Sequence, residues 1–181
     1  MSENDPPLVT AENLSKEYRM GKAVISAVRD VSFSIHSGAF TVISGPSGSG
    51  KSTLLHLLGC LDKPTSGCIR IAGEDVASLP DHTLSAFRAR RLGFIFQSFN
   101  LIPVLTALEN VEYPLRINKV ASQEARTRAQ EMLEAVGLGD LVRHRPTEMS
   151  GGQCQRVAIG RALVMKPDLV LADEPTANLD S

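Results

Sequence analysis

The sequence contains no tryptophan, few aromatic residues and almost no net charge. Aromatic residues make up 4% of its 181 residues, so aliphatic side chains must fill the core. The 19 lysines and arginines nearly balance the 20 aspartates and glutamates, which gives a formal net charge of -1. Because a nucleic-acid-binding domain normally has a clear basic excess, the composition argues against a nucleic-acid partner.

The sequence also lacks the cysteine pattern of a zinc site or of a disulfide framework. Its three cysteines, Cys60, Cys68 and Cys154, form no C-x-x-C pair, and their number is odd. We interpret them as small hydrophobic residues of a cytosolic protein. No stretch approaches ~18 consecutive apolar residues, so we expect no direct membrane span. The acidic, proline-bearing N-terminus does not resemble a secretory signal.

Hydrophobic alternation predicts an antiparallel β region near the N-terminus. Residues 8–35 have a strand-like composition. Within them, Val31, Phe33 and Ile35 alternate with serines, which is typical of a half-buried antiparallel strand. The Met20-Gly21 dipeptide predicts a turn that divides this region.

Two apolar runs without alternation predict the strands of an α/β core. These runs, residues 40–43 and 169–172, fit short strands covered on both faces. A glycine-rich turn joins the first run to a leucine-rich helix over residues 52–58. For one of the later helices, Ser122 is a possible N-cap and Gly137 the C-terminal stop. Further helices are predicted over residues 81–91, 122–136 and 152–164.

The turn before the leucine-rich helix has the pattern of a phosphate-binding loop. The pattern G-x-x-x-x-G-K-[ST] is matched by Gly45, Pro46, Ser47, Gly48, Ser49, Gly50, Lys51 and Ser52. Glycines let successive backbone N–H groups point at phosphate oxygens, and the next helix directs its positive end to the same anion. Lys51 is expected to reach the β- and γ-phosphates, Ser52 to ligate Mg²⁺, and Thr53 to contact the α-phosphate. The flanking strand and helix patterns favour this interpretation over a flexible loop.

Two adjacent acids follow the second apolar run. In phosphate-loop proteins an acid at a strand end holds Mg²⁺ through water, and Asp173 fits that role. Glu174 lies one residue farther on, where a carboxylate can orient and polarise an attacking water as general base. Adjacent acids at a strand end are otherwise often solvated turn residues, but the phosphate loop in the same chain favours a catalytic role.

A second helix start also has the features of an anion site. It is formed by Met149, Ser150, Gly151, Gly152 and Gln153. Ser150 is a good N-cap, and the two glycines leave the backbone N–H groups of the first turn accessible. Spacing alone would equally fit an ordinary capped helix.

These three motifs, in this order, resemble the ATP-binding subunit of ABC transporters. Residues 149–153 are similar to that family's signature, with Met at the position that is usually Leu. Gln97 resembles the Q-loop glutamine, Tyr18 the aromatic residue that stacks on adenine, and residues 177–180 the D-loop, which ends in Asp180. The resemblance implies an α/β fold: a P-loop NTPase (RecA-like) core with an N-terminal antiparallel β subdomain and an inserted α-helical subdomain.

The resemblance also implies that the protein hydrolyses ATP with Mg²⁺. The catalytic residues would be Glu174, Gln97 and Lys51, and the Mg²⁺ ligands would be Ser52, Gln97 and Asp173. Two copies would form a homodimer in which each ATP lies between the phosphate loop of one copy and the signature of the other. Hydrolysis would power an integral-membrane permease, which places the protein in the cytoplasm, peripheral on the inner face of the cell membrane.

Three runs look most like one branch of the family. Residues 54–62, 101–111 and 171–180 resemble the branch that serves lipoprotein release and macrolide export. Residues 99–101, just past the Q-loop, would then face the permease, although an ordinary core role fits them equally. Two residues differ from those usual in this branch. Cys154 stands where the branch usually has a polar or charged residue, and Gly160 stands where it usually has an alanine.

The expected organisation is one partial ABC ATP-binding domain. Residues 8–80 would form the β subdomain and the phosphate-loop part of the core, 81–163 the Q-loop and helical subdomain, and 164–181 the second core strand and D-loop. Family members continue with another core strand and a switch histidine, whereas all four histidines here precede Asp173. We therefore expect a fragment whose core is truncated after the D-loop. The alternative is an ATP-gated scaffold module that hydrolyses ATP weakly or not at all.

Overall fold

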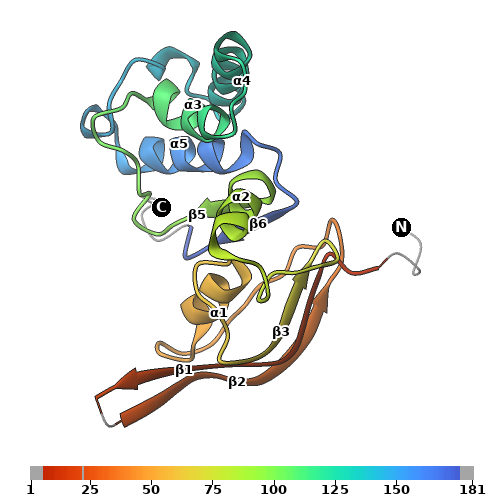
Figure 1. Cartoon of the computed structure of the whole chain (residues 1–181). Helices are drawn as coiled ribbons and strands as arrows, with labels where there is room; N and C mark the ends of the chain where they lie inside the picture. The colour runs from red at the N-terminus through yellow and green to blue at the C-terminus, as the bar shows by residue number, and fades with distance from the viewer. Residues whose placement is uncertain (1–5, 22, 176–181) are drawn as a thin grey trace. The chain divides into compact units, whose positions relative to one another are not determined.

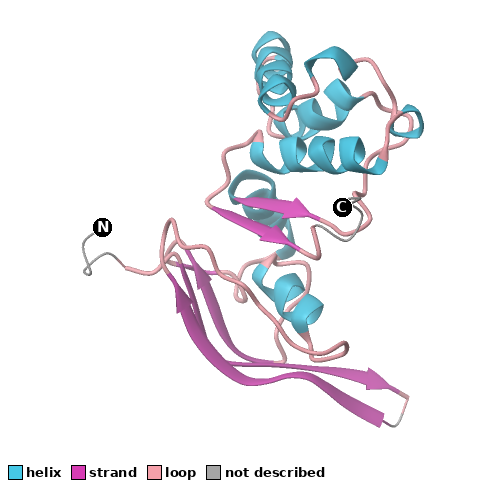
Figure 2. Ribbon diagram, turned by 180° about the vertical axis from the view of Figure 1, so that it is seen from behind, coloured by secondary structure: helices cyan, strands magenta, loops and turns pink. Residues whose placement is uncertain are grey.

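The computed structural model describes residues 6–21 and 23–175 (Figures 1 and 2). The chain consists of two units. The first unit is Met1–Ser85 and the second is Ala86–Ser181. An antiparallel sheet dominates the first unit, whereas a parallel strand pair and a group of helices form the second. The mixed α/β architecture with separate β and helical parts agrees with the predicted fold class. Every helix in the described ranges is too short or too polar to traverse a lipid bilayer.

The sheet of the first unit has the strand order β2-β1-β3-β4. Strands β1 (Val9–Met20) and β2 (Ala23–Ile35) form a long antiparallel hairpin (Figure 2). Strand β3 (Ser66–Ile71) pairs with the other side of β1, and the short β4 (Glu74–Asp75) pairs with β3. The hairpin confirms the predicted antiparallel region.

The predicted alternation in β2 is present in the structure. Val31, Phe33 and Ile35 are half-buried, and the serines between them are exposed. Aliphatic side chains form most of the core of this unit, as expected for a chain without tryptophan. They include Val9, Ala11, Leu14, Val28, Leu57, Leu58, Ile69, Ile71 and Val76.

Residues 40–43 do not form the strand that their apolar sequence predicts. They adopt no regular structure, and the side chains of Phe40 and Val42 are 94% and 72% exposed. A buried parallel strand is stable only when neighbouring strands satisfy its backbone and both of its faces are covered. Among the described residues, this run pairs with neither sheet. The prediction of a buried strand here was therefore wrong.

Two helices of the first half of the chain lie close to their predicted positions. Helix α1 (Lys51–Leu58) begins at the lysine of the phosphate loop and buries its last two leucines. Helix α2 (Asp81–Arg91) matches the predicted range and crosses the division between the units. Arg91, in its last turn, forms an ion pair with Asp168 at 3.1 Å.

The second unit contains a parallel pair of short strands. Strand β5 (Leu92–Ile95) lies beside β6 (Leu169–Ala172), with Ile95 opposite Ala172. Strand β6 confirms the predicted strand over these residues. Val170 is nevertheless 41% exposed, so β6 is not covered on both faces.

Three α-helices form the main helical part of the second unit (Figure 1). They are α3 (Ala107–Ile117), α4 (Ser122–Ala135) and α5 (Gly151–Leu163). Two short 3₁₀ helices, η1 (Gly139–Leu141) and η2 (Pro146–Glu148), lie between α4 and α5. The three main helices share a core made of Ala107, Leu108, Val111, Leu115, Ala125, Ala129, Leu133, Leu138, Val157 and Val164.

The N-terminal end of α4 differs from the prediction, whereas its C-terminal end agrees with it. Its N-cap is Ala121 rather than Ser122, and no side chain caps it. Ser122 is instead the first residue of the helix. Gly137 has a φ of 71°, which confirms it as the predicted stop.

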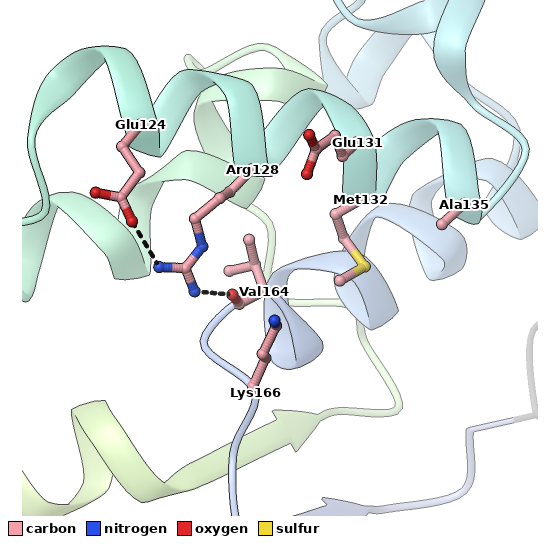
Figure 3. Close-up of a pocket in the computed structure, with 7 residues that line it drawn as sticks. All are labelled: Glu124, Arg128, Glu131, Met132, Ala135, Val164 and Lys166. Atoms are coloured by element: carbon pink, nitrogen blue, oxygen red, sulfur yellow. Dashed lines mark hydrogen bonds and ion pairs between the residues drawn. The ribbon is translucent and has the colours of Figure 1, made fainter.

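Gly160, one of the two departures from the family branch, lies inside α5. A Cβ added there would lie 3.3 Å from Met132 Cγ and 3.5 Å from Val111 Cγ2. Met132 is a flexible side chain that lines a cavity of about 460 Å³, so it can move aside (Figure 3). Because glycine in a helix interior costs ~1 kcal/mol relative to alanine, Gly160→Ala should raise the free energy of unfolding by about 0.5–1 kcal/mol.

Urea denaturation checks this prediction against Gly137→Ala as the control. Gly137 has a left-handed backbone, so alanine there should lower the stability instead. A loss of stability in Gly160→Ala would show that Met132 is fixed in place.

Candidate functional site

The predicted phosphate loop is an exposed turn that leads directly into α1. Gly48 and Gly50 have left-handed backbones, with φ of 78° and 90°. The Ser49 N–H donates to the Pro46 carbonyl at 3.2 Å, which closes the turn. Gly50 is the N-cap of α1 and has no side chain to occupy the first N–H groups of the helix. These groups are therefore positioned to receive an anion.

Gly50 also fits the loop against the sheet of the first unit. A Cβ at this position would lie 2.1 Å from the Ala27 carbonyl oxygen of β2, far inside van der Waals contact. Both this close approach and the left-handed φ require glycine. The second glycine of the motif thus holds the start of α1 beside the hairpin.

The Lys51 side chain folds back across the loop. Its Nζ donates to the carbonyls of Gly45 and Pro46, each at 3.0 Å. The ammonium group and the helix N-terminus therefore direct positive charge to one small turn. A phosphate group is the anion whose charge and oxygen geometry suit such a turn.

Tyr18 is held beside α1 by a network of polar contacts. Its hydroxyl donates to Asp62 Oδ2 at 2.9 Å. Lys16 lies 5.0 Å from the ring centroid and binds Asp62 Oδ1 at 2.6 Å. Partial burial and the bond to Asp62 raise the pKa of Tyr18. The ring is thus fixed in orientation while 38% of the side chain stays exposed to a stacking partner.

Asp62 keeps its charge in this network. Partial burial acts to raise the pKa of Asp62, but hydrogen bonds from Lys16, Tyr18 and the Lys63 N–H outweigh it and lower that pKa. The carboxylate therefore remains an acceptor for the Tyr18 hydroxyl at neutral pH.

In the second unit, the carboxyl ends of β5 and β6 bring three predicted residues together. The strands are parallel, so the residues that follow them meet at one edge. The Asp173 N–H donates to the Ile95 carbonyl at 3.0 Å and extends the ladder. Just beyond, Gln97 Nε2 donates to Glu174 Oε2 at 2.9 Å. The glutamine and the glutamate thus form one hydrogen-bonded pair.

The predicted Mg²⁺ ligands have the right donor chemistry for that ion. Mg²⁺ prefers oxygen donors, and Ser52, Gln97 and Asp173 offer a hydroxyl, an amide oxygen and a carboxylate. Gln97 and Asp173 follow the two strands of the second unit, whereas Ser52 is in the first turn of α1 in the first unit.

The start of α5 is a complete capping box. The Gln153 N–H donates to Ser150 Oγ at 3.3 Å, and the Ser150 N–H donates to Gln153 Oε1 at 2.8 Å. This geometry confirms Ser150 as the predicted N-cap. Because the cap uses the Gln153 N–H, the N–H groups of Gly151 and Gly152 are the donors that the first turn can offer to an anion.

One predicted motif lies outside the described residues. Asp180 and the rest of the expected D-loop, residues 177–180, belong to this part of the chain.

Sequence reasoning missed Asn110, a fully buried polar residue of α3. Its Oδ1 accepts from the Ile102 N–H at 2.8 Å. Its Nδ2 donates to the carbonyls of Ile102, Leu105 and Thr106 at 3.0–3.1 Å. Asn110 thereby fixes the segment between the Q-loop and α3. The available signal was an asparagine on the apolar face of an amphipathic helix, near Ala107 and Val111.

The cavity of about 460 Å³ lies between α4 and the residues that follow α5, and none of the predicted site residues lines it (Figure 3). At its edge Arg128 Nη1 lies 3.5 Å from Glu124 Oε1, and Arg128 Nη2 donates to the Val164 carbonyl at 2.8 Å. The guanidinium group therefore already has protein partners.

Comparison with known proteins gives consistent matches over almost the entire chain. The family described as ABC transporter matches residues 28–177. An uncharacterized ABC transporter ATP-binding protein of Thermotoga maritima is 55% identical over 166 residues, 92% of this chain and 71% of the relative. The ABC transporter ATP-binding protein YknY of Bacillus subtilis is 47% identical, over 96% of this chain and 76% of the relative.

Solved structures match as well. One is a dimeric, post-hydrolysis structure of the ATP-binding cassette MJ0796 bound to ADP and Pi. Its TM-score to this structure is 0.89 at 48% sequence identity, over 96% of this chain and 76% of that chain.

Proposed function

The chain belongs to the ABC transporter family, and from this premise we propose that it binds and hydrolyses ATP to power a membrane permease. The observation that carries the proposal is the loop of residues 45–52. Its left-handed glycines, the start of α1 at Lys51 and the inward-folded ammonium group together favour a bound polyphosphate.

ATP would bind in the first unit through groups of complementary chemistry. The loop N–H groups and Lys51 would contact the phosphates. Tyr18, whose ring is oriented by the hydrogen bond to Asp62, would stack on adenine. The triphosphate and the base would therefore be recognised by two adjoining parts of the same unit.

Hydrolysis would depend on the pair formed by Gln97 and Glu174. Glu174 would accept a proton from water as the water oxygen bonds to the γ-phosphorus and the bond to the β–γ bridging oxygen breaks. The hydrogen bond from Gln97 orients the Glu174 carboxylate. Ser52, Gln97 and Asp173 would hold Mg²⁺, which when bound offsets charge on the phosphate oxygens.

A second copy of the chain would complete each ATP site. The capped start of α5 offers the N–H groups of Gly151 and Gly152 to the γ-phosphate of ATP bound to the partner. The MJ0796 cassette is described as dimeric, which supports this arrangement. ATP would then bring two positive helix ends together, and hydrolysis would release them.

The permease would be of the export or lipoprotein-release type, at the inner face of the cell membrane. This part of the proposal is supported by the resemblance of residues 54–62, 101–111 and 171–180 to that branch of the family. Residues 99–101 would contact the permease.

Removing the Tyr18 ring tests the nucleotide site directly. Stacking of a base on an aromatic side chain is worth ~1–3 kcal/mol, so Tyr18→Ala should weaken ATP binding by about tenfold. Fluorescence titration with a labelled ATP analogue measures the change. Tyr113→Ala is the matched control, because Tyr113 lies on α3 and is 43% exposed. Equal affinities for the two variants would refute the assignment of Tyr18.

A further inference from the structure

Arg161, in the last turn of α5, reaches the segment that follows Gln97. Its Nη1 donates to the Asn100 carbonyl at 2.6 Å, and its Nη2 donates to the Phe99 carbonyl at 2.7 Å. The guanidinium fork thus binds two successive carbonyls at once. Both acceptors are neutral, although a partly buried cation is more often paired with a carboxylate. Burial accordingly lowers the pKa of Arg161.

The segment that Arg161 binds has an unfavourable backbone conformation. Phe99 and Asn100 are consecutive non-glycine residues with φ of 57° and 48°. The left-handed region is disfavoured for a bulky residue such as phenylalanine, and it persists only where the surroundings hold it. Within the segment, the Phe99 N–H donates to the Phe96 carbonyl and the Asn100 N–H to the Ser98 carbonyl. Arg161 adds two hydrogen bonds from a different element.

The residues on both sides of this contact belong to the proposed catalytic apparatus. Gln97 lies two residues before Phe99 and donates to Glu174. Helix α5 begins after Ser150, at the proposed contact with the partner's ATP. Arg161 lies eleven residues after Ser150, so at ~1.5 Å per residue the helix separates that contact from Arg161 by about 16 Å. Helix α5, a rigid element, therefore joins the proposed contact with the partner's ATP to the segment that follows Gln97.

We propose that Arg161 is a positioning residue that fixes the backbone after Gln97 to the signature helix and so holds Gln97 on Glu174. When ATP bound to the partner contacts the start of α5, Arg161 would then transmit that contact to Gln97 and Glu174. The proposal rests on the proposed ATPase function, because it assigns the residue that couples two parts of that machinery.

Substitution of Arg161 should affect turnover more than ATP binding. In Arg161→Met both hydrogen bonds are lost, and a misplacement of ~1 Å at a reacting group can cost about 100-fold in rate. We expect kcat to fall at least tenfold while the KM for ATP changes less than twofold, since Lys51 and its loop are untouched. Arg161→Lys keeps the charge but cannot form the fork, so its kcat should lie between those of Arg161→Met and the wild type.

Amide hydrogen exchange gives a readout that a general loss of stability would not reproduce. The amides of Phe99 and Asn100 should lose protection in both variants, whereas that of Val157, in the middle of α5, should keep it. Arg128→Met is the matched control, because Arg128 also donates to a carbonyl of the same unit, that of Val164. This variant should keep wild-type kcat and wild-type protection at residues 99 and 100.

The outcomes separate this proposal from the proposed function. Folded Arg161→Lys or Arg161→Met protein with wild-type kcat and wild-type protection of both amides would overturn the positioning role. If Arg161→Met does not fold, Arg161→Lys decides by the same two measurements. If the wild-type protein hydrolyses no ATP, the proposed function fails, and unchanged amide protection in the variants would then count against Arg161 as well.

Discussion

Replacing Glu174 by glutamine is expected to lower kcat for ATP hydrolysis at least a hundredfold while ATP still binds. Glutamine has the same size as glutamate and can accept the hydrogen bond from Gln97, so the geometry at the strand ends is kept. It cannot accept a proton, and a positioned general base contributes ~10²–10⁴-fold to the rate. The variant should therefore bind ATP and fail to hydrolyse it.

A second effect of Glu174→Gln is expected on the assembly state. If ATP joins two copies and hydrolysis separates them, the variant should accumulate as a dimer at saturating MgATP. Phosphate release measures the first effect, and light scattering after size exclusion measures the second. Glu131→Gln is the control, because Glu131 is exposed on α4 and lies at the cavity, away from the strand ends. A Glu174→Gln protein that turns over ATP within threefold of wild type, or stays monomeric with ATP, would contradict the proposed mechanism.

The features that sequence predicted well are those set by neighbouring residues. The start of α1 at Lys51, the capping box at Ser150 and the stop at Gly137 each depend on side chains within a few positions. The alternation in β2 is likewise a local pattern with a period of two residues. Because such signals need no distant partner, the sequence alone was sufficient for them.

The prediction for residues 40–43 failed because a strand is defined by its partners. Their apolar composition fits a buried strand, but a strand of this kind forms only where adjacent backbone groups complete the ladder. Among the described residues this run has no such ladder. The apolar composition therefore indicated a preference for a strand, but the tertiary structure provides no partner strand for it.

The residues that position the Q-loop could not be derived from spacing. Arg161 and Asn100 are 61 positions apart, and their contact exists only because α5 packs beside the segment after β5. In the sequence, no feature distinguishes Arg161 from any other arginine of an amphipathic helix. Asn110 gave a weak signal, but its four hydrogen bonds depend on a loop conformation that no local rule specifies.

Loss of the Lys51 ammonium group is expected to have the largest effect on nucleotide affinity. Each hydrogen bond to a charged group contributes ~1.5–3 kcal/mol, and the proposed contacts join Lys51 to both the β- and γ-phosphates. Lys51→Ala should therefore weaken MgATP binding by about a hundredfold or more. Lys63→Ala is the matched control, because Lys63 belongs to the same unit and forms an exposed ion pair with Asp81.

Calorimetric titration of MgATP onto wild type, Lys51→Ala and Lys63→Ala, each with a native circular dichroism spectrum, tests the nucleotide site most directly. We predict wild-type affinity for Lys63→Ala and a dissociation constant raised about a hundredfold or more for Lys51→Ala. A folded Lys51→Ala protein that binds MgATP as tightly as wild type would contradict the assignment of residues 45–52 as the nucleotide site.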